Sequence, residues 1–396
     1  MPNQWLECVD CGNELEEGSY VLDCPRCEGL LDVKFGNWCK EKAAGNDVRS
    51  CTPFAEECFE MRDCELDTPL FHSTALSNGC DLEVWVKNEV VHPTGTWKER
   101  EGLISMLRAR QQDVSDLVLF SSGNTGVAVA RAACLVPAAP RLHLVVPDKS
   151  LRRLTPYQKY LRPPHVQLYG HSGSNDECIA FAKRVARENG YHFEGGFRNY
   201  ARREGLKTLG LEIALQSIRF DWYVQAVASG IGIYSFHKAF RDLGRVDHCP
   251  KILGVQSEVC APMANAWRDG STSLEDRHIP SEIAPSEFVT VLRTRNPRDS
   301  YRYVQATLRA VGGAFEKVPD SDILAGLREF YREPQFLRLF DEQGVVVGLE
   351  AAAALGGLMR AVRSGVVSRG SRVVLNVSGA AKPGDVNHVW IADLLS

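Results

Sequence analysis

From about residue 82 onward, apolar residues recur with two alternating periods along the chain. Short apolar runs that end at Gly, Pro or polar residues are typical of buried strands, and apolar residues every three or four positions are typical of helices. The predicted strands are residues 82–87, 117–120, 142–146, 166–169, 222–227, 252–256 and 373–377, and the predicted helices are 99–110, 127–135, 178–188, 234–243 and 349–363. Strands joined through helices form parallel sheets with both faces covered. The pattern therefore predicts an α/β protein.

The same pattern suggests how the 396 residues are divided, since a chain of this length usually folds into two or three domains. Residues 1–36 form a separate four-cysteine segment, and residues 37–82 are a polar connector with one short helix. We expect two parallel-sheet α/β domains after that, at residues 83–200 and 201–396.

The N-terminal segment carries two Cys-x-x-Cys pairs, Cys8 with Cys11 and Cys24 with Cys27, separated by twelve residues. Two such pairs at this distance are typical of a zinc ribbon, in which four thiolates bind Zn²⁺ tetrahedrally. Four thiolates leave no open coordination position, so the metal would be structural. Scattered free cysteines are the alternative, but they do not explain the repeated spacing. The next four cysteines lack such spacing and are interpreted as bystanders: Cys39, Cys51, Cys58 and Cys64.

Composition excludes several classes of protein. A net charge of -4 argues against a nucleic-acid-binding surface that covers the whole molecule. No run approaches the ~18 apolar residues of a membrane span. The first residues lack the basic and apolar parts of a signal peptide, and thirteen cysteines without one suggest reduced thiols. We expect a cytoplasmic protein that acts on small molecules and forms a homo-oligomer, most simply a dimer.

Lys98 is the first candidate for chemistry. It follows a predicted strand, the breakers Pro93 and Gly95, and a Thr at position 94 or 96 that can cap a helix. The lysine is thus placed in the first helical turn at the carboxyl end of a strand, where open α/β sheets bind ligands. The N-terminus of a helix also disfavours an ammonium ion, which favours the neutral amine. An exposed lysine in a solvated turn is the alternative, because most lysines are exposed.

Three further strand ends carry polar or glycine-rich sequences. The segment Ser229-Gly230-Ile231-Gly232-Ile233 joins a strand to a helix, where backbone N–H groups can bind a phosphate. Ser121-Ser122-Gly123-Asn124-Thr125-Gly126 also joins a strand to a helix and could hold a carboxylate or a ring hydroxyl. Ser378 ends the last predicted strand. Each has a plain structural alternative: a strand-to-helix turn for the first, a helix cap at Asn124 or Thr125 for the second, and a turn serine for the third.

Taken together, the four features resemble the pyridoxal-phosphate (PLP) enzymes of the tryptophan-synthase β family, or fold type II. The resemblance implies that Lys98 forms the Schiff base with the cofactor and that Asn124 hydrogen-bonds its ring oxygen. It also implies that Ser378 faces the pyridine nitrogen. The phosphate of the cofactor would be bound by the glycine-rich loop of Ser229, Gly230, Ile231, Gly232 and Ile233.

The resemblance extends over almost the whole chain and narrows to the threonine-synthase branch, with cysteate synthase as the most similar member. The four-cysteine start and Thr94-Gly-Thr-Trp-Lys-Glu-Arg100 resemble that branch, and the segments 194–207, 225–230 and 262–267 resemble cysteate synthase. Ile233 stands where the family has Gly. Two alanines follow Gly379 where the family is richer in glycine, and cysteate synthase tends to lack a hydroxyl at the Ser378 position. These departures bear on the nucleophile and the leaving group.

The resemblance implies a β-replacement in which Lys98 is also the base at Cα. O-phospho-L-serine would lose phosphate to give an aminoacrylate, and sulfite would add to form L-cysteate. The substrate carboxylate would bind at Ser121, Ser122, Gly123 and Thr125. One or two arginines would bind the anions, first Arg198 and Arg202 with their neighbours Arg203 and Lys207, and second the group of Lys149, Arg152 and Arg153. For each of these basic residues a solvated helix face is the alternative.

Two other functions remain open at this point. A threonine synthase, or another β-replacing or eliminating enzyme, would keep the same cofactor and use a different substrate or nucleophile. A non-catalytic zinc-ribbon binding protein would have lost the chemistry, but the chain retains Lys98, Asn124 and Ser378 and lacks a basic, aromatic-rich patch.

Overall fold

The computed structural model of the protein describes residues 4–16, 18, 20–36, 52, 66–283, 292–382 and 385. The chain forms two compact units, and each consists of three separate segments of the chain. Unit 1 comprises Met1–Asp67, Lys98–Leu215 and Ser235–Asp247, and unit 2 comprises Thr68–Trp97, Gln216–Tyr234 and His248–Ser396. The predicted connector helix and the bystander cysteines Cys39, Cys51, Cys58 and Cys64 lie outside the described residues.

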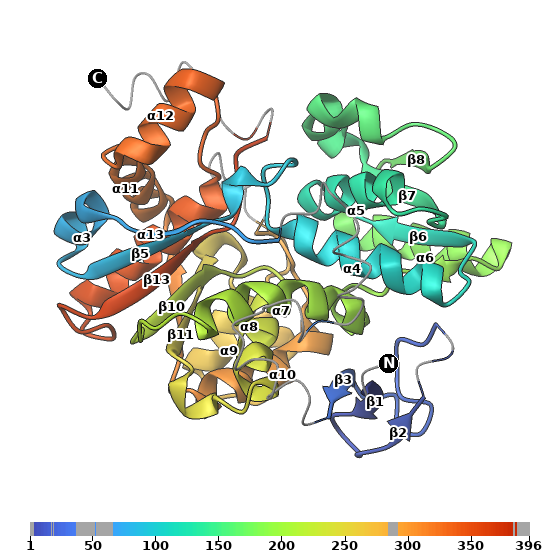
Figure 1. Ribbon diagram of the computed structural model, residues 1–396, viewed down its shortest axis with the longest axis horizontal. Coiled ribbons are helices and arrows are strands. Elements are labelled where there is room, and N and C mark those ends of the chain that lie inside the picture. Colours follow the sequence, from blue (N-terminus) through green and yellow to red (C-terminus); the bar gives the residue numbers. More distant parts are fainter. Residues whose placement is uncertain are drawn as a thin grey trace. The chain divides into compact units, whose positions relative to one another are not determined.

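Unit 2 is built on a six-stranded sheet in the order β12-β11-β10-β13-β5-β4. Figure 1 labels the neighbouring strands β11, β10, β13 and β5 of this sheet. All neighbours in this sheet are parallel except the edge pair β4 and β5. Parallel pairing with almost wholly buried central strands is the arrangement expected for strands covered on both faces. Its strands are β4 (Leu70–His72), β5 (Glu83–Asn88), β10 (Trp222–Ala226), β11 (Lys251–Ser257), β12 (Ala314–Val318) and β13 (Arg372–Val377). The described helices of the unit are α3 (Thr74–Cys80), α9 (Pro262–Arg268), α10 (Arg298–Ala310), α11 (Asp320–Phe330), α12 (Pro334–Gln343) and α13 (Leu349–Arg363).

The alanine-rich helix α13 covers the middle of this sheet. It packs against β10, β11, β12 and β13, and its apolar side chains belong to the same buried core as Val84, Val255 and Leu375. Small side chains on a helix allow its backbone to approach the sheet closely. This face of the sheet is therefore closely packed and apolar.

Unit 1 contains a second parallel sheet, in the order β8-β7-β6-β9, which confirms the predicted α/β class. Leu103, Ile104 and Leu107, the residues that predicted the helix after Lys98, are buried in its core. Nowhere in the described ranges is a helix long and apolar enough to cross a membrane. The strands are β6 (Asp116–Phe120), β7 (Arg141–Pro147), β8 (Val166–His171) and β9 (His192–Phe193), and the helices are α4 (Lys98–Gln111), α5 (Asn124–Leu135), α6 (Asn175–Asn189), α7 (Tyr200–Ala214) and the 3₁₀ segments η3 (Asp148–Tyr160) and η4 (Gly196–Arg198). Helix α8 (Ile231–Asp242) begins in unit 2 and continues into unit 1.

Helices α4 and α7 of unit 1 pack against one another at unusually close range. Gly205 makes this possible, because a Cβ atom at that position would lie 2.2 Å from the carbonyl oxygen of Arg100. Behind the contact, the guanidinium of Arg100 is fully buried and pairs with Glu212 and Thr208 of α7. The close approach places the middle of α7 beside the first turn of α4, while the start of α7 lies beside the last turn of α4.

The N-terminal segment forms a three-stranded antiparallel sheet of β2 (Glu14–Leu15), β1 (Gln4–Cys8) and β3 (Leu31–Phe35), with Cys8 at the end of β1 and the other three cysteines in the connections between strands. This ribbon is attached to the rest of unit 1 by buried polar contacts. Arg203 of α7 donates to the carbonyl of Leu31 and lies 3.4 Å from Asp32, and Tyr20 donates to the carbonyl of Glu194 at 3.1 Å. The ribbon thus supports the segment that leads into α7.

Candidate active site

Lys98 is the first residue of helix α4, as the sequence predicts, and its side chain is only 18% exposed. Its Nζ lies 3.2 Å from Oε2 of Glu101, one turn further along the helix. Burial lowers the pKa of Lys98 below its ordinary value; Glu101 opposes this shift, and Arg202 adds to it. A lysine with a lowered pKa releases its neutral amine more easily, and the neutral amine is the nucleophilic and basic form. Lys98 is therefore not an ordinary solvated lysine.

Glu101 connects Lys98 to two other predicted site segments. Its side chain is fully buried, and its Oε1 accepts a hydrogen bond of 2.7 Å from the hydroxyl of Thr125 and lies 3.9 Å from Nε of Arg202. Burial alone would raise the pKa of Glu101, but Arg202, Lys98 and the Thr125 hydroxyl hold it below its ordinary value. Glu101 is consequently an anion, and sequence reasoning missed it. Its i+3 spacing from Lys98 was the signal that could have identified it.

Arg202 and Arg198, the two predicted anion-binding residues, have different surroundings. Arg202 binds Glu194 in a two-pronged contact, at 3.0 and 3.1 Å, and its Nε also lies 3.9 Å from Oε1 of Glu101. Arg198 instead pairs with Asp23 of the ribbon at 2.9 Å and donates to the carbonyl of Glu28. The structure thus brings Arg202 close to Lys98 and places Arg198 at the ribbon. Their neighbours Arg203 and Lys207 are fully buried and pair with Asp32 and with Glu204 and Asp242, respectively.

The loop that precedes α5 is shorter than predicted, because the helix begins at Asn124 rather than at residue 127. Gly123 is the N-cap, so Asn124 and Thr125 belong to the first turn of the helix. The hydroxyl of Ser121 accepts from the N–H groups of Gly123 and Gly126 at 3.2 and 2.8 Å and fixes the turn. Ser122 is half-buried beside them. The cap alternative is thereby excluded, and the polar atoms of Asn124 are not used for capping.

In the second predicted basic group, Lys149, Arg152 and Arg153, the residue close to the loop before α5 is Arg153. It comes from η3, is 5% exposed, and its Nε would lie 2.9 Å from a Cβ atom at Gly123. Lys149 and Arg152 are exposed. A buried guanidinium next to the turn of Ser121 and Gly123 is a further positive charge at the predicted carboxylate-binding loop.

The glycine-rich loop connects β10 to α8 in unit 2. Gly230 has a left-handed backbone (φ +77°), and the helix starts at the next residue. A Cβ atom at Gly232 would lie 2.2 Å from the indole of Trp97 and 2.3 Å from the amide of Gln225, so only glycine fits. The side chains of Ile231 and Ile233 are buried, which leaves the backbone of this turn as the binding element. A glycine turn at the start of a long helix is a typical phosphate site.

Ser378 lies where β13 ends, next to the residues that precede Lys98. Its carbonyl accepts from the N–H of Trp97 at 3.0 Å and from the hydroxyl of Thr96 at 3.3 Å. This contact follows from the parallel pairing of β13 with β5, which brings the carboxyl ends of both strands to one edge. Unit 2 therefore holds Ser378 and Gly232 against residues 96–97. Within unit 1, Glu101 contacts Lys98, Thr125 and Arg202.

The residues present fit PLP. Lys98 would supply a partly desolvated amine, the start of α8 would supply backbone N–H groups for a phosphate, and Ser378 would supply a hydroxyl at a strand end.

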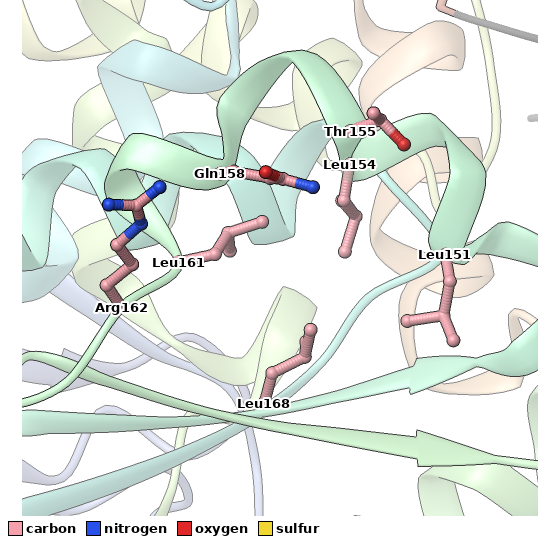
Figure 2. Close-up of a pocket in the computed structure, with 7 residues that line it drawn as sticks. All are labelled: Leu151, Leu154, Thr155, Gln158, Leu161, Arg162 and Leu168. Carbon is pink, nitrogen blue, oxygen red and sulfur yellow. The ribbon is translucent and has the colours of Figure 1, made fainter.

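A separate pocket of about 310 Å³ in unit 1 is lined by none of the predicted site residues (Figure 2). Its walls come from η3 and β8 and are mostly apolar: Leu151, Leu154, Thr155, Gln158, Leu161, Arg162 and Leu168.

The four cysteines of the ribbon form one cluster, with all four sulfur atoms within 4.8 Å of one another. The Cys8–Cys27 and Cys11–Cys24 sulfur distances are 3.5 and 3.8 Å. A tetrahedron with metal–sulfur bonds of ~2.3 Å has edges of ~3.8 Å, so the arrangement fits a four-thiolate zinc site.

Comparison with known proteins decides the family. Residues 61–379, most of the chain, match the family described as pyridoxal-phosphate dependent enzymes. The chain belongs to this family. This PLP-dependent enzyme is 28% identical to the cysteate synthase of Methanospirillum hungatei, a match that covers 96% of this chain and 90% of the relative. It is 26% identical to the threonine synthase of Methanosarcina acetivorans, over 94% of this chain and 91% of the relative.

Solved structures agree with this PLP enzyme in fold. Threonine deaminase isoform 2 from Solanum lycopersicum matches with a TM-score of 0.67 and 16% identity, over 89% of this chain and 87% of that one. Maize serine racemase matches with a TM-score of 0.64 and 18% identity, over 85% and 94%. These likenesses confirm the predicted fold type II architecture.

Proposed function

We propose that the enzyme replaces the phosphate of O-phospho-L-serine with sulfite and forms L-cysteate and phosphate. The observation that carries the proposal is the partly desolvated Lys98 at the start of α4. Its partner Glu101 also lies close to the guanidinium of Arg202. The full-length similarity to cysteate synthase, at 28% identity, supports the choice of substrate. The enzyme thus belongs among the β-replacing members of its family.

The proposed roles of the cofactor-binding residues follow from the resemblance to the family. Lys98 would hold PLP covalently, and Asn124, in the first turn of α5, would bind its ring oxygen. The loop from Ser229 to Ile233 would bind the phosphate with backbone N–H groups, and the Ser378 hydroxyl would bind the ring nitrogen. PLP itself supplies the electron sink that makes Cα acidic. Lys98 accepts the Cα proton and later returns it.

The substrate is proposed to bind with its carboxylate on the turn formed by Ser121, Ser122, Gly123 and Thr125. Arg153, packed against Gly123, adds positive charge at this end. Arg202 is the better placed of the two predicted arginines for the phosphate or sulfite, because it lies on the Lys98 side of α7. Arg198 stays a prediction for the same role.

Threonine synthase is the second candidate function. The 26% identity to that enzyme over 94% of the chain favours it, as does the hydroxyl residue at position 378. O-phosphohomoserine would then replace O-phosphoserine, and water would be the nucleophile.

One experiment separates these functions. The PLP-loaded protein is incubated with O-phospho-L-serine and, in separate reactions, sulfite, sulfide or no added nucleophile, and with O-phosphohomoserine alone. Mass spectrometry then identifies the amino-acid product. We expect cysteate from O-phosphoserine and sulfite. Threonine from O-phosphohomoserine would favour the second candidate, and release of pyruvate from O-phosphoserine whether or not a nucleophile is added would identify a lyase.

We also propose that Cys8, Cys11, Cys24 and Cys27 bind one structural zinc ion per chain. Changing Cys24→Ser should remove the metal and lower the unfolding midpoint by at least about 5 °C, because metal binding contributes directly to folding. Metal analysis and thermal unfolding measure both effects. Cys134→Ser, at a half-buried cysteine outside the cluster, is the matched control. Equal metal content in both variants would contradict the proposal.

A further inference from the structure

Glu101 is a fully buried carboxylate that lies between Lys98 and Arg202. Its two oxygens have separate partners: Oε2 accepts from Nζ of Lys98 at 3.2 Å, and Oε1 accepts from the hydroxyl of Thr125 at 2.7 Å. A buried charge is costly unless other groups compensate for it. The position in the first turn of α4 contributes, because the N-terminus of a helix stabilises an anion.

The described charges around Lys98 in unit 1 balance one another. Lys98 and Arg202 are the cations, and Glu101 and Glu194 are the anions that face them. Glu194 is already engaged, since it binds the guanidinium of Arg202 and accepts from the side-chain amide of Asn199 at 2.8 Å. Glu101 is therefore the carboxylate that is in direct contact with the lysine.

We propose that Glu101 is a positioning residue that orients the Lys98 amine toward the Thr125 turn and stabilises its protonated form during turnover. The inference rests on the proposed function, in which Lys98 accepts a proton from Cα and returns it. When the proton moves from Cα to the lone pair on Nζ, the new positive charge faces the Glu101 carboxylate. The same contact keeps Nζ on the side of α4 where Thr125 holds the substrate turn.

Glu99, in the same helical turn, is a glutamate with a structural role only. Glu99 is also buried, but its carboxylate points to Arg131 of α5, with which it forms a 3.0 Å ion pair. The groups that shift the pKa of Lys98 are Glu101, Arg202 and Glu194, together with burial. Glu99→Gln thus changes the same charge in the same helical turn without touching the lysine, and it is the matched control for Glu101→Gln.

The test measures the protonation of Lys98 itself in the full-length protein without PLP. Lysines are labelled competitively with acetic anhydride across a pH series, and the peptide that contains Lys98 is quantified by mass spectrometry. Removal of the Glu101 charge lowers the pKa of Lys98 further, since burial and Arg202 are then opposed by Glu194 but no longer by Glu101. At a fixed pH below that pKa, Glu101→Gln should therefore label Lys98 about 3- to 10-fold faster than the wild type. Glu99→Gln should match the wild type.

Equal labelling rates in Glu101→Gln and Glu99→Gln would overturn the proposal. If Glu101→Gln does not fold, Glu101→Asp is used instead, because it keeps the negative charge but moves it away from the Lys98 amine. The labelling rate of Lys98 should then rise by a smaller factor. An unchanged rate would overturn the proposal. The visible band of the PLP-loaded wild type is recorded in parallel. Absence of that band would refute the proposed function, whereas the labelling rates test Glu101 independently.

Discussion

Lys98→Ala is expected to abolish the covalent attachment of PLP and to lower turnover by at least about 10³-fold. The variant loses both the nucleophilic amine that holds the cofactor and the base that accepts the Cα proton, and a positioned acid–base group alone contributes ~10²–10⁴-fold. Absorption spectroscopy in the visible range reports the attachment, and phosphate release from O-phosphoserine reports the turnover.

Lys183→Ala provides the control for this experiment, because Lys183 is exposed on α6. It should keep the spectrum and the activity of the wild type. Full turnover in Lys98→Ala would show that another group performs the chemistry, and the assignment of the site to the start of α4 would then be incorrect.

Gly232→Ala should weaken PLP binding by about 5- to 150-fold. The added methyl group would lie 2.2 Å from the indole of Trp97 and 2.3 Å from the amide of Gln225, both in a tightly packed region. Overpacking of this kind costs ~1–3 kcal/mol, and every ~1.4 kcal/mol is a factor of ten in affinity when the cost falls on the binding loop. Titration of the protein with PLP, followed by absorbance, measures the change.

The substitution needs a control for the loss of a glycine as such. Gly18→Ala serves, because a Cβ atom at Gly18 has no atom within 4 Å. We expect its PLP affinity to equal that of the wild type, and circular dichroism should show that both variants are folded. Unchanged affinity in Gly232→Ala would mean that the loop between β10 and α8 does not bind the cofactor phosphate.

The class of the fold could be predicted from local pattern, because parallel strands covered on both faces read as short apolar runs between helices. The helix after Lys98 is an example, since Leu103, Ile104 and Leu107 are buried as their spacing predicts. The division of the chain was harder to predict. The sequence suggests one boundary near residue 200, whereas β5 pairs with β13, almost 290 residues away, and lies in unit 2. Such pairing depends on long-range packing that local periodicity does not contain.

At the site, sequence could name the residue types but not the partners of each side chain. Arg198 and Arg202 belong to one basic segment and are only four residues apart. Arg198 nevertheless contacts the ribbon, whereas Arg202 contacts Glu194. Glu101 was missed for the same reason: its importance lies in a buried hydrogen bond to Lys98, and a glutamate in a first helical turn usually only stabilises the helix end. The roles of Asn124, Ser378 and the glycine loop toward PLP stay predictions, as do the homo-oligomer and the cytoplasmic location.

Borohydride reduction of the PLP-loaded protein tests the assignment of Lys98 most directly. Reduction fixes the cofactor to the lysine that carries it, and peptide mass spectrometry then locates the pyridoxyl group. We expect the label on the peptide that contains Lys98, in a yield that matches the loss of the visible band. A pyridoxyl group on another lysine, or a protein that carries none after incubation with PLP, would contradict the assignment.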